Sequence, residues 1–444
     1  MNVGKRVVVL AGPTAVGKSA LALRLCDVLQ GEIISVDSVQ VYRGLQIGAA
    51  KPSTEERARV PHHLLDLREP DEEYTAGAFY KDALHTVEQV LARGRLPVLV
   101  GGTSMYMRWL ARGRPEAPKA DPALNEQVRE LLAPLEAAND WARGLAELQK
   151  LDPARAEQLS RNDWYRLQRA IVVARQTEST AADLGPPADP DGLDALRDSL
   201  DMRCFFLCAP REPLCRRIDQ RCDAMLQQGL LEETTSELLR GHLLPSSPAG
   251  RAIGYRQTLQ YLTRSAWKDG DEAALREYAN TFTGATRKYA REQTKWFRNE
   301  PSFQFVAANW GAPQLTEASV LKHVQCDRRE WEAALADPQQ RELRALEPNA
   351  DKLMKTYVPA LPSLDAPDRR DDLLRRADAC RERIAPRLAE LIEADEGIAT
   401  RFPWHSKAER DEPTSQPDDE EAVGDAPPAK VAKTAPPAEG ERGE

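Results

Sequence analysis

The sequence is poor in cysteine and has no long apolar run. Seven cysteines are spread over 444 residues without a CxxC pair, which excludes a disulfide-dependent scaffold and indicates a reducing compartment. No stretch approaches the roughly 20 apolar residues that a transmembrane helix needs, and the residues before the first apolar stretch are too few for a leader peptide. We therefore expect no membrane partner and a cytoplasmic location, with a mitochondrial or nuclear pool as the alternative.

A surplus of basic residues is also missing, because the formal net charge is −9. Much of this charge is terminal: residues 407–444 contain five basic and eleven acidic residues in a segment rich in Pro, Ala and Glu. Such a composition buries little apolar surface and predicts a disordered acidic tail, which we place at 403–444. The rest of the chain is close to neutral and can therefore carry a local basic surface.

Three apolar stretches near the N-terminus predict buried strands. They are Val7–Ala11, Gly31–Ser38 and Leu96–Met107, and helical patterns separate them. Strands that alternate with helices form a parallel sheet, whose ligands bind at the carboxyl ends of the strands. We predict an α/β fold with core segments at 1–114 and 201–310, an inserted helical subdomain at 115–200 between Pro-rich stretches, and a helical C-terminal extension at 311–402.

The motif GPTAVGKS, Gly12–Ser19, matches the P-loop pattern and lies between a predicted strand and a predicted helix. Its backbone amides and the helix N-terminus form an anion cradle, Lys18 adds a positive charge, and the Ser19 hydroxyl can bind magnesium. A chance glycine-rich turn is the alternative. The motif indicates a phosphate or diphosphate ligand, and by itself it does not indicate ATP.

Polar residues follow the other two strands. Asp37 could be a general base, a magnesium ligand or the cap of the next turn, and the Gln40 amide could pair with the edge of an adenine. Gly101 and Gly102 allow close backbone approach before Thr103, although a structural turn is the more common explanation for such a pair. In the later segment RRIDQR, Arg217 and Arg221 lie one helical turn apart and could reach an anion.

Basic residues recur at helical spacing near the end of the predicted core. Arg287, Arg291, Lys295 and Arg298 form one stripe beside Trp296. A solvated helix face is the usual explanation for such a stripe, but a cationic ridge beside aromatic side chains also suits a nucleic-acid backbone.

Taken together, eight segments in this order resemble the tRNA dimethylallyltransferase family, over residues 7 to about 300. They are GPTAVGKS, SVDSVQVYRGLQIGAAKP, PHHLLDL, LVGGTSMY, RNDWYRLQRA, RRIDQR, RAIGYRQ and YAREQTKWFR. The resemblance implies a magnesium-dependent transfer of the dimethylallyl group from dimethylallyl diphosphate to an adenosine amine 3′ of the anticodon. The enzyme is expected to be a monomer whose partners are dimethylallyl diphosphate and the anticodon stem-loop of a tRNA.

The resemblance also assigns roles to residues. Asp37 would be the general base, and Thr103, Lys18 and Arg221 would complete the catalytic set, with Ser19 as the metal ligand. The diphosphate-binding residues would be Gly12, Pro13, Thr14, Ala15, Val16, Gly17, Lys18, Ser19 and Arg221. The tRNA-binding residues would be Asp37, Ser38, Val39, Gln40, Thr103, Asn162, Asp163, Trp164, Tyr165, Arg166, Arg251, Ala252, Ile253, Gly254, Tyr255 and Arg256. To these we add Arg287, Arg291 and Lys295 of the stripe, because a bound stem-loop must present its phosphates to a cationic surface.

Two points set the chain apart from neighbouring families. Eukaryotic relatives often carry a zinc finger after the core, but KHVQCDRREWEAAL retains only His323 and Cys326 as ligand types, so four zinc ligands cannot be assembled. The nearest alternative function is an adenylate isopentenyltransferase, which acts on free adenine nucleotide and needs no inserted subdomain. A P-loop kinase is the alternative from another class.

Overall fold

The computed structural model describes residues 5–114, 121–177, 192–264, 267–345 and 354–394. The chain divides into two compact units, one formed by Glu116–Pro187 and the other by the residues before and after that segment. Each unit is described by itself, and the predicted acidic tail lies outside the described residues. No helix in the described ranges combines the length and apolar character required to cross a membrane.

A six-stranded parallel sheet forms the centre of the larger unit, in the order β3-β2-β4-β1-β5-β6. The strands are β1 (Arg6–Ala11), β2 (Gly31–Val36), β3 (His62–His63), β4 (Leu96–Gly101), β5 (Asp201–Cys208) and β6 (Phe303–Ala307). Val, Leu and Phe supply most of the buried side chains of β1, β4 and β5, and both faces of the sheet are buried beneath helices. The predicted α/β class is therefore confirmed, while β3 and β6 extend the predicted sheet at its two edges.

The strands that precede the predicted motifs end in register. Ala11 pairs with Gly101, and Val36 pairs with the same Gly101 from the other side. The three loops that follow β1, β2 and β4 therefore begin side by side at the carboxyl ends of the strands. A Cβ atom on Gly101 would lie 1.9 Å from the Val36 carbonyl oxygen, so only glycine allows β2 and β4 to end this closely.

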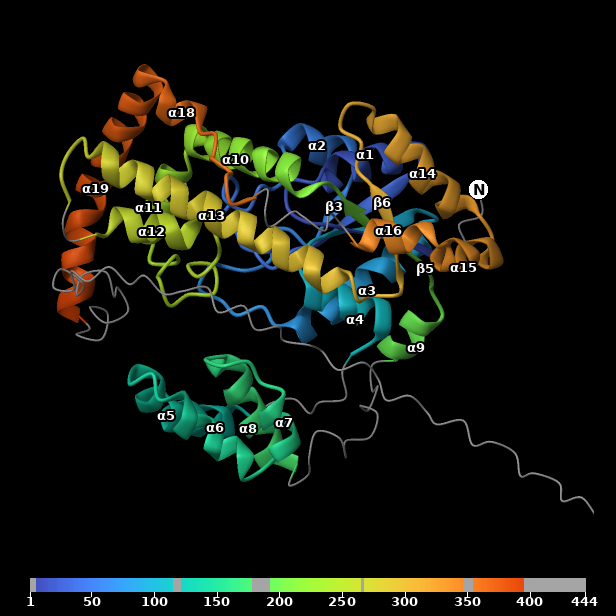
Figure 1. The fold of residues 1–444 in the computed structure, drawn as a ribbon, viewed down its shortest axis with the longest axis horizontal. Coiled ribbons are helices and arrows are strands. Elements are labelled where there is room, and N and C mark those ends of the chain that lie inside the picture. The colour runs from blue at the N-terminus through green and yellow to red at the C-terminus, as the bar shows by residue number, and fades with distance from the viewer. Residues whose placement is uncertain (1–4, 115–120, 178–191, 265–266, 346–353, 395–444) are drawn as a thin grey trace, which may run out of the picture. The chain divides into compact units, whose positions relative to one another are not determined.

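Helices cover both faces of the sheet (Figure 1). Those of the first part are α1 (Lys18–Leu29), α2 (Thr54–Arg59), α3 (Ala76–Ala92), α4 (Ser104–Arg112) and α9 (Leu193–Asp198). Those of the second part are α10 (Arg211–Gln228), α11 (Leu230–Leu239), α12 (Tyr255–Leu262) and α13 (Glu272–Phe297). Figure 1 shows α13 running from the group of α11 and α12 toward the sheet, so that one helix belongs to both regions.

The helices of the segment that we predicted as a helical C-terminal extension, 311–402, belong to the larger unit. They are α14 (Pro313–Gln325), α15 (Arg328–Ala336), α16 (Gln339–Ala345), α18 (Pro362–Asp365) and α19 (Pro367–Ala394). The fully buried Arg203 of β5 donates hydrogen bonds to the carbonyls of Cys326 and Asp327, at 3.3 and 3.2 Å. These contacts fasten the junction of α14 and α15 to the sheet, and the bond to Cys326 supplies a donor to a carbonyl at the C-terminal end of α14.

The smaller unit is a helical subdomain with its own core. It contains α5 (Pro122–Ala137), α6 (Trp141–Gln149), α7 (Pro153–Glu157) and α8 (Trp164–Thr177). Val128, Leu148, Leu167 and Ile171 are buried together within it. We predicted that the insertion would reach residue 200, but α9 belongs to the larger unit, where the Tyr80 hydroxyl donates to Asp194 at 2.6 Å.

A buried carboxylate joins α10 to α13. Asp219 of α10 is fully buried, its Oδ1 forms an ion pair with Arg287 of α13, and its Oδ2 accepts a hydrogen bond from the Tyr357 hydroxyl at 2.5 Å. The Arg287 guanidinium also lies 5.3 Å from the centre of the Tyr357 ring. Arg287, which we predicted to contact tRNA, is therefore a structural partner of the buried Asp219.

We expect Arg287→Ala to lower the free energy of unfolding by about 3 kcal/mol or more, because Asp219 would remain buried and unpaired. The matched variant Arg291→Ala, one turn further along α13 on an exposed residue, should change it by less than about 0.5 kcal/mol. Urea unfolding followed by circular dichroism measures both values. Equal stability of the two variants would contradict the structural role of Arg287.

Candidate functional site

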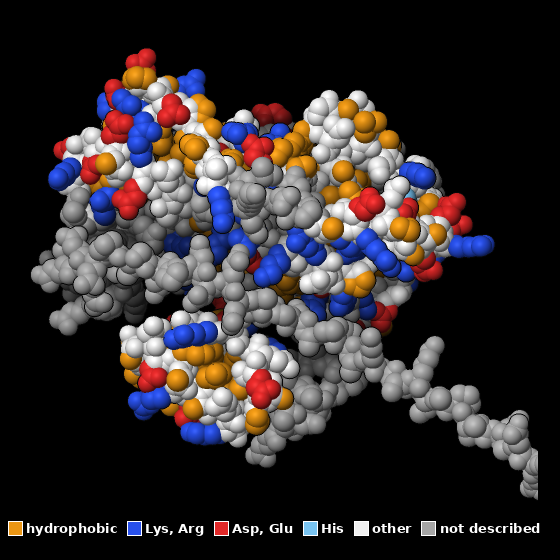
Figure 2. Space-filling view, viewed as in Figure 1, with side chains coloured by type: hydrophobic (Ala, Val, Ile, Leu, Met, Phe, Trp, Pro, Cys, Tyr) orange, Lys and Arg blue, Asp and Glu red, His pale blue; other side chains and the backbone are white. Residues whose placement is uncertain are grey.

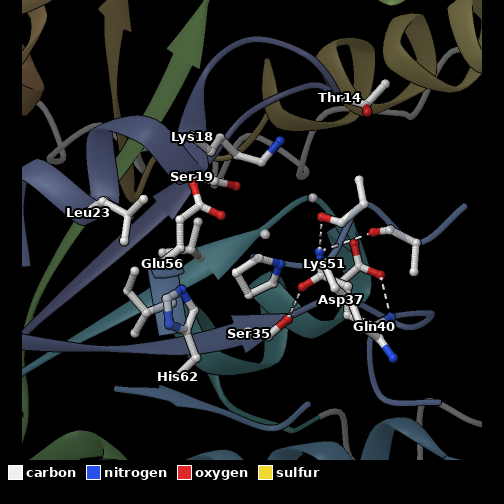
Figure 3. Close-up of a pocket in the computed structure, with 18 of the residues that line it drawn as sticks. Thr14, Lys18, Ser19, Leu23, Ser35, Asp37, Gln40, Lys51, Glu56 and His62 are labelled. Atoms are coloured by element: carbon white, nitrogen blue, oxygen red, sulfur yellow. Dashed lines mark hydrogen bonds between the residues drawn. The ribbon is translucent and has the colours of Figure 1, made fainter. Parts of the chain in front are cut away.

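A cavity of about 320 Å³ lies at the carboxyl ends of the strands. Its walls come from the P-loop and α1, from the loops after β2 and β4, and from α10 and α13. Figure 3 shows Lys18 and Ser19 at the start of α1 on one side of this cavity, with Asp37 and Gln40 across from them. The structure thus brings together the polar residues that followed three separate strands in the sequence.

The P-loop wraps around the N-terminus of α1. Ala15 and Gly17 have left-handed φ values of 64° and 108°, which turn the loop tightly before the helix begins. The Lys18 ammonium donates to the carbonyls of Gly12 and Pro13, both at 2.8 Å. The amides of the first turn of α1 have no intrahelical acceptor, so they are available to an anion.

Two cations lie close together at this end of the cavity. Burial and the neighbouring Arg221 lower the pKa of Lys18 to about 7, although Asp37 acts in the opposite direction. Burial likewise lowers the pKa of Arg221, whose Nη1 donates to the Thr14 hydroxyl at 3.0 Å. Two desolvated positive charges that form no ion pair with the described residues favour the binding of a polyanion between them.

Asp37 uses its two carboxylate oxygens differently. Its Oδ1 accepts hydrogen bonds from the backbone amides of Val39 and Gln40, at 2.8 and 3.2 Å. This is the turn-capping role that the sequence left open. In the described part of the chain, Oδ2 accepts no hydrogen bond, and Asp37 lines the cavity. The cap therefore fixes the orientation of the carboxylate and leaves one oxygen available to a ligand.

Gln40 lines the cavity, but its amide is already engaged. Its Oε1 accepts from the Ser35 hydroxyl at 2.8 Å, and its Nε2 donates to the carbonyls of Ala49 and Ala50, both at 3.2 Å. Both N–H groups are therefore used within the protein. We predicted that this amide pairs with the edge of an adenine, and in the structure it holds residues 49 and 50 at the cavity wall.

Gln293 of α13 is a site residue that the sequence analysis missed. Its Oε1 accepts from the backbone amide of Thr14 at 2.9 Å, and its Nε2 donates to the carbonyl of Gly102 at 2.8 Å. A Cβ atom on Gly102 would lie 2.2 Å from this Nε2. Next to Gly102, the Thr103 hydroxyl accepts from the amide of Ser38 at 3.2 Å. Gln293 and Thr103 therefore tie together the three loops of the site.

Tyr289 lies one turn before Gln293 and also faces the cavity. The i, i+4 spacing of Tyr289 and Gln293 is the sequence signal that could have identified them. This pattern is offset by two residues from the basic stripe, so the two sets point to different faces of one helix.

The segment Arg251–Arg256 is partly buried. Its Tyr255 is fully buried, and the Tyr255 hydroxyl donates to Glu233 at 2.7 Å. The Glu233 carboxylate also accepts from the backbone amides of residues 46, 47 and 48, at 2.7 to 3.0 Å. Tyr255 and the buried Gly254 thus support the loop after Asp37, which corrects their predicted contact with tRNA. Arg251 and Arg256 are exposed.

The basic stripe is shorter than predicted once Arg287 is removed from it. Arg291, Lys295 and Arg298 remain exposed on α13, next to the exposed Lys288. Figure 2 shows Lys and Arg side chains gathered on the face of the larger unit over α13. The side chains of these four residues form no hydrogen bond or ion pair with the described residues, so their charges are available to a partner.

Within the smaller unit, the predicted residues at the start of α8 fall into two groups. Trp164 packs edge-to-face on Trp141, with ring centres 5.1 Å apart, and belongs to the subdomain core, which corrects its predicted role. The exposed Tyr165 shows 80% of its surface to solvent. Asn162 and Arg166 are also exposed, and Asp163 forms an ion pair with Arg166 at 3.2 Å.

A divalent metal ion at this site would need the bound phosphate compound to supply some of its coordinating oxygens. The described residues contain no group of three or more His, Cys, Asp or Glu side chains placed to hold a metal ion. Ser19 lines the cavity with its hydroxyl next to the anion cradle. Magnesium typically takes one or two protein oxygens together with phosphate oxygens and water, and the Ser19 hydroxyl fits that arrangement.

Comparisons with known proteins agree with the geometry of the site. The family model for IPP transferase matches residues 40–300. The chain is 39% identical to tRNA dimethylallyltransferase 9 of Arabidopsis thaliana over 332 residues, which are 69% of this chain and 72% of the relative. It is 42% identical to tRNA dimethylallyltransferase 1 of Trichlorobacter lovleyi over 302 residues, which are 68% of this chain and 93% of the relative.

A solved structure gives the same result for the fold. Crystallographic snapshots of a eukaryotic dimethylallyltransferase acting on tRNA match this structure with a TM-score of 0.56 and 26% sequence identity, covering 72% of this chain and 78% of that chain.

We expect anion binding to weaken as the pH rises above about 7. A bound anion favours charged Lys18, whose pKa in the empty cradle is about 7, so binding above that pH requires uptake of a proton. Sulfate keeps a constant charge near neutral pH, and its dissociation constant should rise by up to about tenfold per pH unit above 7. Calorimetry tests this, and a constant affinity from about pH 6 to 9 would contradict it.

Proposed function

Because the chain belongs to the IPP transferase family, which transfers dimethylallyl groups to tRNA, we propose that its P-loop binds the diphosphate of dimethylallyl diphosphate and that Asp37 is the general base. The acceptor in this proposal is the exocyclic amine of the adenosine 3′ of the anticodon. The observation that carries the proposal is the single cavity in which the cationic P-loop faces Asp37.

The transfer exchanges one bond for another. The adenine nitrogen forms a bond to the first carbon of the dimethylallyl group, the bond from that carbon to the diphosphate oxygen breaks with its electrons, and the nitrogen loses a proton. Negative charge therefore grows on the leaving diphosphate. The positive charges of Lys18 and Arg221 and the first-turn amides of α1 surround the place where this charge develops, which lowers the barrier.

Asp37 is suited to accept the proton from the amine. Its Oδ1 is held by two backbone amides, so the carboxylate does not have to be oriented during the reaction. Its Oδ2 remains the acceptor for the proton. The Thr103 hydroxyl accepts from the amide of Ser38, the residue after Asp37, and in this proposal it is a second polar contact for the adenine.

Magnesium is the metal that we propose for this site, with Ser19 as its protein ligand. When bound with the substrate, the ion would neutralise part of the diphosphate charge. Ser19 then orients the diphosphate, while Lys18 and Arg221 supply the fixed positive charges. This division of roles requires no further protein ligand.

The tRNA must present a single base to a recessed cavity. An amine in a stacked anticodon loop is reached only when the base is turned out of the stack, and the rest of the loop then needs a cationic surface outside the cavity. Arg251 and Arg256 are exposed in one segment, and Arg291 and Lys295 are exposed on α13, the helix that also carries Gln293 into the cavity. We propose that these four side chains contact the tRNA backbone.

We predict that the purified chain, incubated with dimethylallyl diphosphate, magnesium and unmodified tRNA, adds a dimethylallyl group to adenosine. Mass spectrometry of the tRNA nucleosides detects the product. Asp37→Asn should lower the turnover by about 100-fold or more, because it removes the base, while the dissociation constants of diphosphate and tRNA change little. The amide retains the Oδ1 cap, so a loss of binding is not expected.

Two outcomes would contradict this proposal. Transfer at the normal rate by Asp37→Asn would show that another group removes the proton. Release of inorganic phosphate from ATP, without any change in the mass of adenosine, would show that the P-loop acts on a nucleotide.

Replacing Arg291 and Lys295 with glutamine should reduce the salt dependence of tRNA binding. Each phosphate contact that is lost lowers the slope of log affinity against log salt by roughly one unit, and the affinity for diphosphate should stay constant. The matched control replaces the exposed Lys322 and Arg329 of α14 and α15, which removes the same charge from other helices. Filter binding measures the slopes, and equal slopes in the two variants would refute the role of α13.

A further inference from the structure

The P-loop is braced from outside the cavity by a residue that lies beyond the family match at residues 40–300. The indole Nε1 of Trp310, in the turn after β6, donates to the carbonyl of Val16 at 2.9 Å. Its ring covers Gly17, where an added Cβ atom would lie 3.8 Å from Nε1. Trp310 is not part of the cavity wall, so these contacts act on the outer side of the loop.

Arg217 extends the same brace from α10. Its guanidinium carbon lies 4.6 Å from the centre of the Trp310 ring, and its Nε donates to the carbonyl of Ala15 at 3.2 Å. Trp310 and Arg217 therefore hold two consecutive carbonyls of the P-loop while they stack on each other. A cation over an indole ring is a favourable pair in its own right.

Ala15, whose carbonyl accepts from Arg217, has a strained backbone conformation. Ala15 has a φ of 64°, a left-handed conformation that costs about 1 kcal/mol for a residue with a side chain. Two donors on the carbonyls of Ala15 and Val16 offset this cost and keep the loop in one conformation. The turn that carries Trp310 is itself fixed, because the amide of Asn309 donates to the Thr316 hydroxyl at 2.9 Å.

We propose that Trp310 and Arg217 are positioning residues that hold the P-loop in its diphosphate-binding conformation. The brace rests on the proposed function, because it assumes that the cradle binds the diphosphate. With the brace in place, the loop does not have to be ordered when the substrate arrives. Its loss should therefore weaken the binding of diphosphate, and should leave the binding of tRNA unchanged.

The test measures the dissociation constant of inorganic diphosphate, with magnesium, by calorimetry on the full chain. Trp310→Ala should raise this constant by about five- to tenfold, the size of one or two lost hydrogen bonds. Trp310→Phe keeps a ring beneath Arg217 and loses only the N–H group, so its effect should be smaller. Ala15→Gly in the Trp310→Ala background should recover part of the affinity, because glycine adopts the left-handed conformation without strain.

The matched control is Trp267→Ala. Trp267 also lies beneath an arginine, with the guanidinium carbon of Arg381 5.8 Å from its ring centre, and it packs on Tyr261 away from the P-loop. It should lower stability without changing the affinity for diphosphate. The tRNA dissociation constant of every variant should equal that of the unmodified chain.

Three results would overturn the brace. The first is an unchanged affinity for diphosphate in both Trp310 variants, with transfer activity intact. The second is an equal loss in Trp267→Ala, and the third is a loss in Trp310→Ala that Ala15→Gly does not recover, since each indicates general destabilisation. An unmodified chain that transfers no dimethylallyl group and binds no diphosphate would overturn the proposed function, and the brace with it.

Discussion

The common ending of three parallel strands is the constraint on which the site depends. Ala11, Val36 and Gly101 finish in register, so the P-loop, the turn at Asp37 and the turn at Thr103 leave the sheet side by side. Parallel pairing keeps these ends on one edge. The Gln293 amide then joins two of the three loops through Thr14 and Gly102. The P-loop and the Asp37 carboxylate are thereby held at one cavity by separate loops of the sheet.

Local sequence patterns were sufficient for the parts of the site that follow long strands. The P-loop, Asp37 and Thr103 each come directly after an apolar stretch, and the topology of a parallel sheet implies that they meet. The two edge strands were missed for physical reasons. β3 is a pair of histidines with no apolar run, and β6 is a strand of only five residues, FQFVA, in which Gln304 interrupts the apolar residues.

For helix α13, the spacing of residues in the sequence does not predict which side chains make buried contacts. Arg287 and Arg291 have the spacing of one face, yet only Arg287 meets the buried Asp219, 68 residues earlier in the chain. Gln293 carries no charge and breaks no periodicity, so its role became visible only when α13 was seen against the loops after β1 and β4. The same holds for Tyr255, whose partner Glu233 is recognisable only from the three backbone amides that its carboxylate accepts. The contacts of Arg287, Gln293 and Tyr255 all depend on which side of their helix faces the rest of the protein. That orientation is set by tertiary packing and cannot be read from the local sequence.

The contacts of the P-loop also bear on how the protein is made. During synthesis the P-loop precedes its partners Gln293 and Trp310 by 279 and 294 positions. Contacts over such separations close late, because the intervening chain must be synthesised and folded first. A nascent chain therefore carries the complete motif before it can form either contact. Both contacts are present only when β6 and the turn after it have emerged.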